Sequence, residues 1–170
     1  FTNKLNTVWD AMQNVGFNKE LWITELGWYT ITDGYTEEEQ ARRAIITQTV
    51  FDRFSKENGN NGKYIWYDMV NDGNDAGYSE NNYGLLTRAF IPKQSYYAYS
   101  AFNDLVENKP LIDVKPITTS FFIGGYSFEY NDAENGLSTY VIYDIMNKSY
   151  TLDLSKHKGK TATVENMYGD

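Results

Sequence analysis

Apolar side chains near the start of the chain first follow a helical spacing and then a strand-like one. The helical set recurs every three or four residues and consists of Leu5, Val8, Trp9 and Met12. The next run, residues 21–24, is apolar at nearly every position and ends on Glu25. Such a run is typical of a parallel strand that is buried on both faces. The sequence therefore predicts a helix followed by a buried strand.

The same order of elements repeats farther along the chain. Thr36 and Glu39 form a capping box that predicts the start of a helix, and the Asn- and Gly-rich residues 58–62 predict its end. Residues 64–67 are another aromatic and β-branched run, which ends on Asp68. The polar loop that follows is longer than a simple connection requires, which is typical of a functional loop.

A third helix is expected from Pro92, because proline favours the first helical position. Its apolar residues lie between Tyr96 and Val106. Short strands that alternate with helices predict βα units, in which the strands are parallel. The expected fold of residues 1–108 is therefore α/β.

The character of the chain changes after Asn108. Pro110 and Pro116 bracket an extended segment, and beyond it short apolar runs alternate with turn residues. The expected strands are residues 120–130, 137–145, 149–154 and 160–165. The expected hairpin connections are residues 131–136, 147–148 and 158–159. Residues 109–170 are therefore predicted to form an all-β domain with an antiparallel sheet of about four strands.

Composition and charge exclude several classes of function. Asp and Glu outnumber Lys and Arg by 23 to 15, and the resulting net charge of -8 makes nucleic acid and anionic membranes poor partners. The chain has no cysteine, which excludes a disulfide framework, a thiolate metal site and a cysteine nucleophile. Its one histidine, His157, lies in a polar stretch that is typical of a turn rather than of a catalytic triad. No apolar run is long enough for a transmembrane helix, so we expect no membrane insertion.

Two carboxylates directly follow the predicted parallel strands. Glu25 ends the first strand and Asp68 ends the second. Active sites of α/β proteins lie at the carboxyl ends of parallel strands, so both are candidate functional groups. The alternative is structural, with Glu25 solvated at a strand end and Asp68 a turn residue ahead of Asn71 and Gly73. The aspartates in residues 72–75 do not match the spacing of a calcium loop, and we expect neither a metal nor a cofactor.

Aromatic residues surround both carboxylates. Trp28 follows Glu25, Trp66 precedes Asp68, and Tyr83 lies in the second loop. Aromatic rings stack on the C–H faces of sugars while carboxylates bond the hydroxyls, so this composition favours a carbohydrate ligand. A protein interface or ordinary core packing is equally consistent with it.

Several segments together resemble the clan of retaining (β/α)8-barrel glycoside hydrolases that contains cellulases, mannanases and β-xylosidases. The motif on strand seven of that barrel is similar to residues 21–28, Leu-Trp-Ile-Thr-Glu-Leu-Gly-Trp. Strand eight, its long loop and the last helix resemble residues 65–68, 71–73, 83–86 and 92–98. A strand pair of the β-sandwich module that often follows the barrel resembles residues 160–170. The resemblance implies the C-terminal part of a TIM barrel in residues 1–108, followed by an incomplete β-sandwich-type domain in residues 109–170.

The resemblance also implies a reaction. Glu25 matches the nucleophile of a double displacement at a β-glycosidic bond. The resemblance implies that its side chain points into a saccharide pocket beside the neighbouring indole. Trp66 matches the floor of the sugar subsite. The further candidate substrate contacts are Trp28, Asp68, Glu80 and Tyr83.

The chain departs from the clan at the acid/base residue. In the clan this glutamate follows an asparagine on strand four, whereas Glu57–Asn58 and Glu107–Asn108 have the reverse order and end helices. A whole barrel takes about 250 residues. We therefore expect a portion of a longer enzyme, with the N-terminal remainder of the barrel as its partner and no activity in this chain alone.

Two other functions stay open at this point. One is a non-catalytic carbohydrate-binding module, and the other is a cell-surface structural domain whose β-rich tail packs against a neighbour. Polymeric glycans lie outside the cell, so a hydrolase of this class is expected to be extracellular or at the cell surface.

Overall fold

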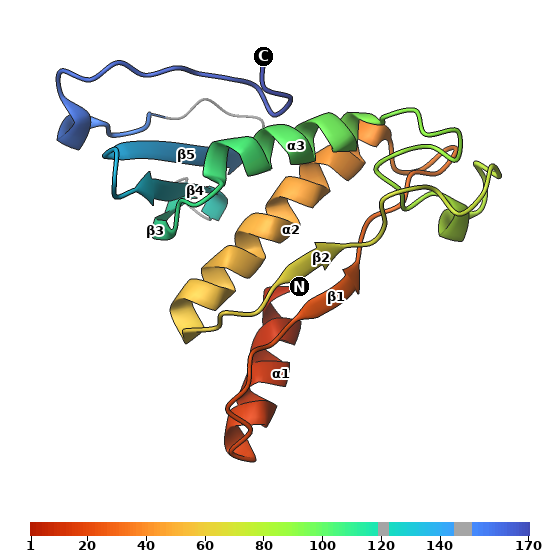
Figure 1. Cartoon of the computed structure of the whole chain (residues 1–170), viewed down its shortest axis with the longest axis horizontal. Coiled ribbons are helices and arrows are strands. Elements are labelled where there is room, and N and C mark those ends of the chain that lie inside the picture. Colours follow the sequence, from red (N-terminus) through yellow and green to blue (C-terminus); the bar gives the residue numbers. More distant parts are fainter. Residues whose placement is uncertain (119–122, 145–150) are drawn as a thin grey trace. The chain divides into compact units, whose positions relative to one another are not determined.

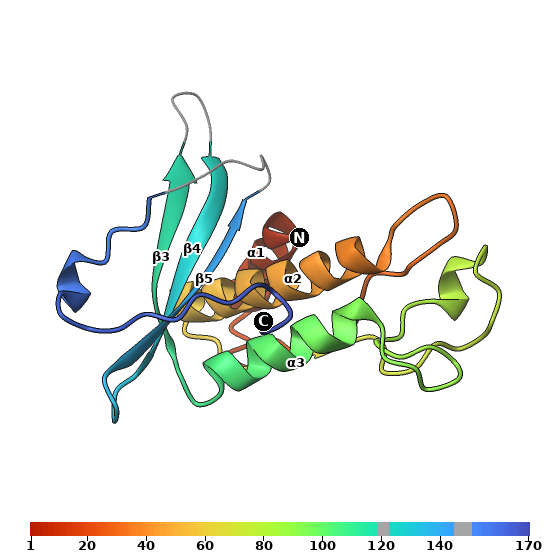
Figure 2. The same ribbon diagram turned by 90° about the horizontal axis from the view of Figure 1, so that it is seen from above.

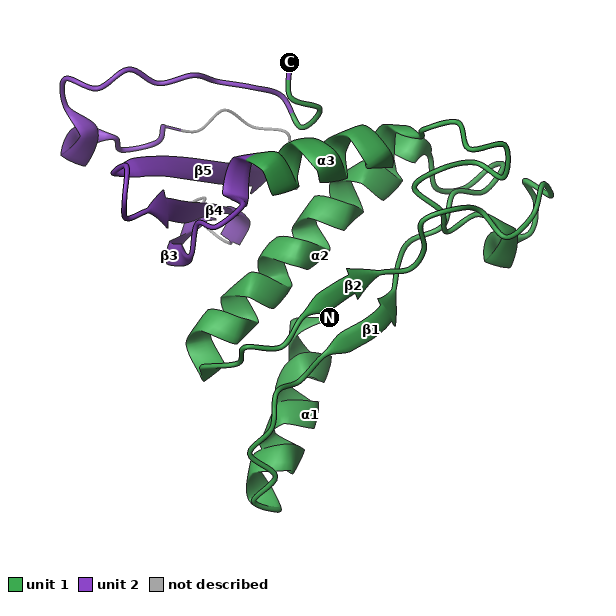
Figure 3. Cartoon of the chain, viewed as in Figure 1, with its two compact units in different colours: residues 1–104, 167–169 green, residues 105–166, 170 purple. Residues whose placement is uncertain are grey.

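Two short parallel strands form the sheet of the first of two units. In the computed structural model, which describes residues 1–118, 123–144 and 151–170, unit 1 comprises residues 1–104 and 167–169 (Figure 3). β1 (Ile23–Leu26) and β2 (Tyr64–Trp66) pair in parallel (Figure 1). The predicted parallel pairing is confirmed, although β1 begins two residues later than the apolar run suggested.

Three helices accompany these strands along the chain: α1 (Thr2–Asn14), α2 (Glu37–Asn58) and α3 (Gln94–Val106). The predicted capping box is confirmed, because the amide of Glu39 donates to Thr36 Oγ1 at 3.2 Å and the amide of Thr36 donates to Glu39 Oε2 at 3.1 Å. The α2 helix ends at Gly59, whose φ of 64° is left-handed.

The predicted start of the third helix at Pro92 is wrong. Pro92 pairs with Leu86 in an isolated antiparallel bridge, and the amide of Lys93 donates to the carbonyl of Leu85 at 3.0 Å. These bonds hold residues 92 and 93 extended, so α3 begins at Gln94.

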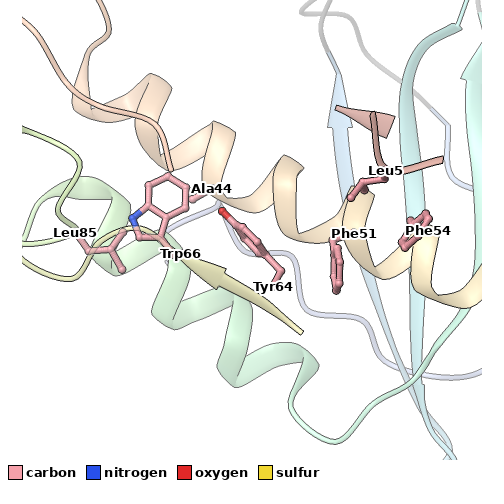
Figure 4. Packing of buried hydrophobic residues seen from close by; sticks show 7 residues of the cluster. All are labelled: Leu5, Ala44, Phe51, Phe54, Tyr64, Trp66 and Leu85. Carbon is pink, nitrogen blue, oxygen red and sulfur yellow. The ribbon is translucent and has the colours of Figure 1, made fainter. Parts of the chain in front are cut away.

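The hydrophobic core of unit 1 lies on the helical side of the sheet (Figure 4). Its buried members come from α1, α2, β2 and the chain that follows β2. They are Leu5, Ala44, Phe51, Phe54, Tyr64, Trp66 and Leu85. Tyr64 and Trp66 point toward this core, whereas Ile65 between them is 46% exposed. The prediction that residues 21–24 form a strand buried on both faces is wrong, because Ile23 packs against the core while Trp22 is 48% exposed and Thr24 is also exposed.

Unit 2 comprises residues 105–166 and 170 and contains a three-stranded antiparallel sheet (Figure 2). Its strands are β3 (Leu111–Thr118), β4 (Ile123–Asp132) and β5 (Leu137–Asp144), in the order β3-β4-β5. The hairpin predicted at residues 131–136 is confirmed, and Gly136 has a φ of 63° there. A mixed α and β architecture with an antiparallel sheet is thus shown.

The extended segment predicted between Pro110 and Pro116 is confirmed, because it forms β3. β3 continues through Pro116, which is tolerated because β3 is an edge strand of the described sheet and pairs with β4 there. Other predictions for the all-β region are wrong in the described residues. Residues 151–154 and 160–165 are not strands, so residues 158–159 connect no hairpin. Residues 120–122, 145, 147–148 and 149–150 of the predicted strands and turns lie outside the described residues.

A short 3-10 helix, η2 (Ser155–His157), replaces the regular sheet in this region. Lys156 forms an ion pair with the buried Glu129 on β4, and His157 Nε2 lies 2.9 Å from the Tyr140 hydroxyl on β5. Side-chain contacts with the sheet, rather than a backbone ladder, therefore hold η2.

Candidate functional site

A β-bulge determines the direction of the Glu25 side chain. Ile23 pairs with Tyr64 and Leu26 pairs with Trp66, so β1 has four residues where β2 has three. Ile23 and Leu26 both pack against the core, and the two residues between them, Thr24 and Glu25, are both exposed. A bulge re-aims side chains in this way, and it directs Glu25 to the open face of the sheet. Glu25 is exposed rather than enclosed in the expected saccharide pocket.

Asp68 lies at the corresponding end of β2. Its carbonyl accepts a hydrogen bond from the amide of Leu85 at 3.0 Å, while its buried Oδ1 has no hydrogen-bond partner among the residues that the structure describes. Burial, followed by the charge of Asp72, raises the pKa of Asp68 to about 6. The sequence thus placed Asp68 next to the candidate nucleophile's strand, and the structure adds a poorly solvated carboxyl group.

The raised pKa makes Asp68 a source of pH-dependent stability. The protonated form is favoured in the folded state, so its contribution is complete below the unfolded pKa of 3.8 and is lost as the pH rises through about 6. A shift of about two pKa units corresponds to about 3 kcal/mol. Because the group is partly solvated, we expect about 1 to 2 kcal/mol to remain after screening.

Lys93 joins the two loops that follow β1 and β2, named here the β1 loop (residues 27–36) and the β2 loop (residues 67–93). Its side chain is 2% exposed, and its Nζ donates to the carbonyl of Asn82 at 3.1 Å and to Thr30 Oγ1 at 3.4 Å. Burial lowers the pKa of Lys93 to about 8. The loops are therefore tied together by a buried cation.

Gln40, on α2, is a second buried group that holds both loops. Its Nε2 donates to the carbonyl of Trp28 at 2.6 Å and to the carbonyl of Tyr83 at 3.1 Å, and its Oε1 accepts from Ser95 Oγ at 2.8 Å. Gly27 brings the loops close as well, because a Cβ at this position would overlap the carbonyl oxygen of Tyr67. The ends of the strands are thus a fixed framework rather than loose loops.

The two predicted indole contacts face the helices. Trp28 Nε1 donates to Thr47 Oγ1 at 3.2 Å, and the guanidinium of Arg43 lies 4.3 Å from the ring centroid of Trp28. Trp66 is 8% exposed, and its Nε1 donates to the carbonyl of Tyr83 at 3.3 Å. Both indoles pack against other parts of unit 1. The roles of Trp28 and Trp66 in sugar binding stay predictions.

A cluster of tyrosines occupies the region where indoles were expected. This tyrosine cluster consists of Tyr29, Tyr67 and Tyr83, whose ring centroids lie 5.4 Å apart for Tyr29 and Tyr83 and 5.6 Å apart for Tyr67 and Tyr83. All three side chains are half-buried. Sequence reasoning placed all three among the aromatic residues near the carboxylates but selected only Tyr83 as a candidate substrate contact. Strand alternation could have found Tyr67, because it follows the core-facing Trp66 and must point to the opposite face.

Acidic groups flank the tyrosine cluster. The Tyr67 hydroxyl donates to Asp72 Oδ2 at 3.0 Å. Glu80 is exposed on the 3-10 helix η1 (Ser79–Asn81).

No group of three or more His, Asp or Glu side chains in the described ranges is placed to hold a metal ion. None of the described helices is both long and apolar enough to cross a membrane.

Comparison with known proteins gives a similarity to solved structures. No family model matches the chain, and no curated protein matches it. The chain is similar to a solved family 39 glycoside hydrolase from the gut symbiont Bacteroides cellulosilyticus WH2, with 28% sequence identity and a TM-score of 0.46. The match covers 68% of this chain and 24% of that chain, so the chain corresponds to about a quarter of that protein's length.

Proposed function

We propose that unit 1 is part of a retaining glycoside hydrolase in which Glu25 is the nucleophile. The observation that supports this most directly is the bulge in β1, which turns a carboxylate to the open face of a parallel sheet beside the carboxyl end of the strand. Asp68 ends the neighbouring strand at the same edge. Glu25 would attack the anomeric carbon to form a glycosyl-enzyme, which water then hydrolyses.

The second carboxyl group of this mechanism would come from elsewhere in the protein. A retaining enzyme needs an acid/base carboxyl group about 5 to 5.5 Å from the nucleophile. We infer that further strands of a (β/α)8 barrel complete the sheet and supply this group. The exposed apolar side chains support this inference, since Trp22, just before β1, and Ile65, on β2, are 48% and 46% exposed.

The remaining parts of the proposal follow from the same assignment. Completion of the barrel would enclose Glu25, which is exposed in this chain, and would form the saccharide pocket around it. Unit 2 would then be the start of a β-sandwich-type accessory domain. Because the substrates of such hydrolases are extracellular glycans, we propose an extracellular or cell-surface location. Asp68, Glu80 and Tyr83 would contact substrate hydroxyl groups.

The test is the variant Glu25→Gln in the intact protein. Turnover of an aryl β-glycoside should fall by several orders of magnitude, while substrate binding and the melting temperature change little. Glu38→Gln is a matched control, because Glu38 is an exposed carboxylate on α2 whose partner is Arg42 at the surface. A large loss of melting temperature with a modest loss of rate would assign a structural role to Glu25 instead. The isolated chain should show no turnover.

A second candidate function is non-catalytic carbohydrate binding, which the tyrosine cluster favours. Covalent labelling by a 2-fluoroglycoside separates the two functions, because only an activated nucleophile at an anomeric carbon reacts. Mass spectrometry should locate the label on Glu25 in a hydrolase. Binding of glycans by an intact protein that takes up no label would favour the binding module.

A further inference from the structure

The tyrosine cluster lies in a strongly acidic environment. The hydrogen bond to Asp72 is the main cause of the raised pKa of Tyr67, and the charges of Asp68 and Glu80 act in the same direction. Burial and then Glu80 raise the pKa of Tyr83. Three carboxylates therefore act on the same set of rings.

The cations beside these rings are already engaged. Lys93 is buried and donates to Asn82 and Thr30, so its ammonium group is not presented to a ligand. Arg43 lies over the rings of Trp28 and Tyr35, at 4.3 and 4.5 Å from their centroids. The charge of Lys93 acts on Asp68, whereas Asp72 and Glu80 are exposed.

The chemistry of the cluster fits an uncharged, hydroxylated ring. The three tyrosines pack edge to face, with interplanar angles of 76° and 61°, and they are half-buried, so part of their ring surface remains for C–H groups. Carboxylate oxygens accept hydrogen bonds from sugar hydroxyls, and such charge-assisted bonds are stronger than neutral ones. A carboxylate on the sugar would lose these bonds and meet like charge instead.

We propose that the tyrosine cluster, together with Asp72 and Glu80, is a subsite for neutral sugar rings that rejects the corresponding uronic acids. The proposal rests on the proposed carbohydrate site, but it does not require that Glu25 reacts. The substrate class is therefore a neutral glycan rather than a uronate or sulfated one.

The experiment compares matched neutral and acidic oligosaccharides by calorimetry with the intact protein at low salt. The probes are β-linked cellohexaose and mannohexaose, each paired with the hexauronate of the same linkage. At least one neutral probe should bind about tenfold or more tightly than its acidic counterpart, because each nearby carboxylate repels an added charge. Replacing both exposed carboxylates, with Asp72→Asn and Glu80→Gln, should strengthen uronate binding about tenfold at low salt. The difference in affinity between the neutral and acidic probes should therefore become smaller.

The tyrosine variants test the ring surface itself. Tyr83→Ala should weaken binding of the neutral probe about tenfold or more. Tyr97→Ala is the control and should leave binding unchanged, because Tyr97 is an exposed tyrosine on α3 with its own ring contact to Tyr96 at 5.7 Å. Since Asp72 and Glu80 are at the surface, their double variant keeps the test decisive if Tyr83→Ala does not fold.

The possible failures are distinguishable. Uronates that bind as tightly as their neutral partners, equal effects of Tyr83→Ala and Tyr97→Ala, or no binding by either neutral probe would each overturn the subsite. Neutral binding through Tyr83 without labelling of Glu25 would overturn the proposed hydrolase and support the subsite.

Discussion

Replacing Gln40 with alanine tests whether one buried side chain holds both loops of the candidate site. Gln40 is completely buried, and it makes well-formed hydrogen bonds to the carbonyl groups of Trp28 and Tyr83 and to the hydroxyl of Ser95. The variant loses these bonds. The carbonyl of Tyr83 keeps its hydrogen bond from Trp66 Nε1, whereas the carbonyl of Trp28 and the hydroxyl of Ser95 lose the partner that Gln40 provides. At about 1 kcal/mol for each bond and about 1 kcal/mol for the unpaired groups, the free energy of unfolding should fall by about 3 to 4 kcal/mol.

Two measurements check this prediction in the intact protein. Denaturant unfolding gives the loss of stability, and hydrogen exchange shows where it occurs. Amides of the β1 loop and of residues 82–84 should exchange about a hundredfold faster, since each 1.4 kcal/mol of local opening is about tenfold in rate. Amides in the middle of α2 should change less, because the helix keeps its own bonds.

Gln48→Ala is the matched control. Gln48 lies on the same helix, is half-buried, and donates to Asp52 at 2.8 Å without touching either loop backbone in a hydrogen bond that the structure describes. Its removal should cost about 1 kcal/mol or less. Equal losses for the two variants, or loop amides that exchange as in the wild type, would refute the assignment of Gln40 as the group that holds both loops.

Two further predictions concern the strand ends. In the wild type, the unfolding free energy should fall by about 1 to 2 kcal/mol between pH 4 and 6, measured by denaturant titration at several pH values. Asp68→Asn should remove this fall, and a fall of the same size in the variant would contradict the raised pKa of Asp68. Gly27→Ala should destabilise unit 1 by about 2 kcal/mol or more in the same assay, because the new Cβ overlaps the carbonyl of Tyr67. Gly77→Ala is its control, since a Cβ there meets only the flexible side chain of Asp75, and similar losses for both variants would rule out the close approach.

Local chemistry was readable wherever neighbours in sequence decide the structure. The capping box at Thr36 is a short-range hydrogen-bond pattern, and the structure has both of its bonds. The turn at Gly136 likewise depends on a few adjacent residues. The strand predicted at residues 160–165 was wrong because an alternating pattern forms a strand only when a second strand, distant in sequence, pairs with its backbone groups.

The candidate site also combines features that local sequence predicts with features that depend on distant residues. The positions of Glu25 and Asp68 after two strands followed from the apolar runs, but nothing in the sequence indicated the extra residue in β1. That bulge is a matter of register between strands separated by about forty residues, and it decides the face on which Glu25 lies. The packing of the aromatic residues could not be predicted for a related reason, since composition cannot show which ring packs against a helix.

The sequence by itself determined the helices, the parallel order of β1 and β2, and the acidic residues at their ends, because these depend on periodicity and adjacent groups. Only the tertiary structure decided that the indole of Trp66 belongs to the core and that Asp72 and Glu80 lie beside a cluster of tyrosines. It also revealed the burial of Lys93 and Gln40 between the loops. These features depend on contacts between distant segments, whose energies are set by packing and desolvation rather than by local sequence.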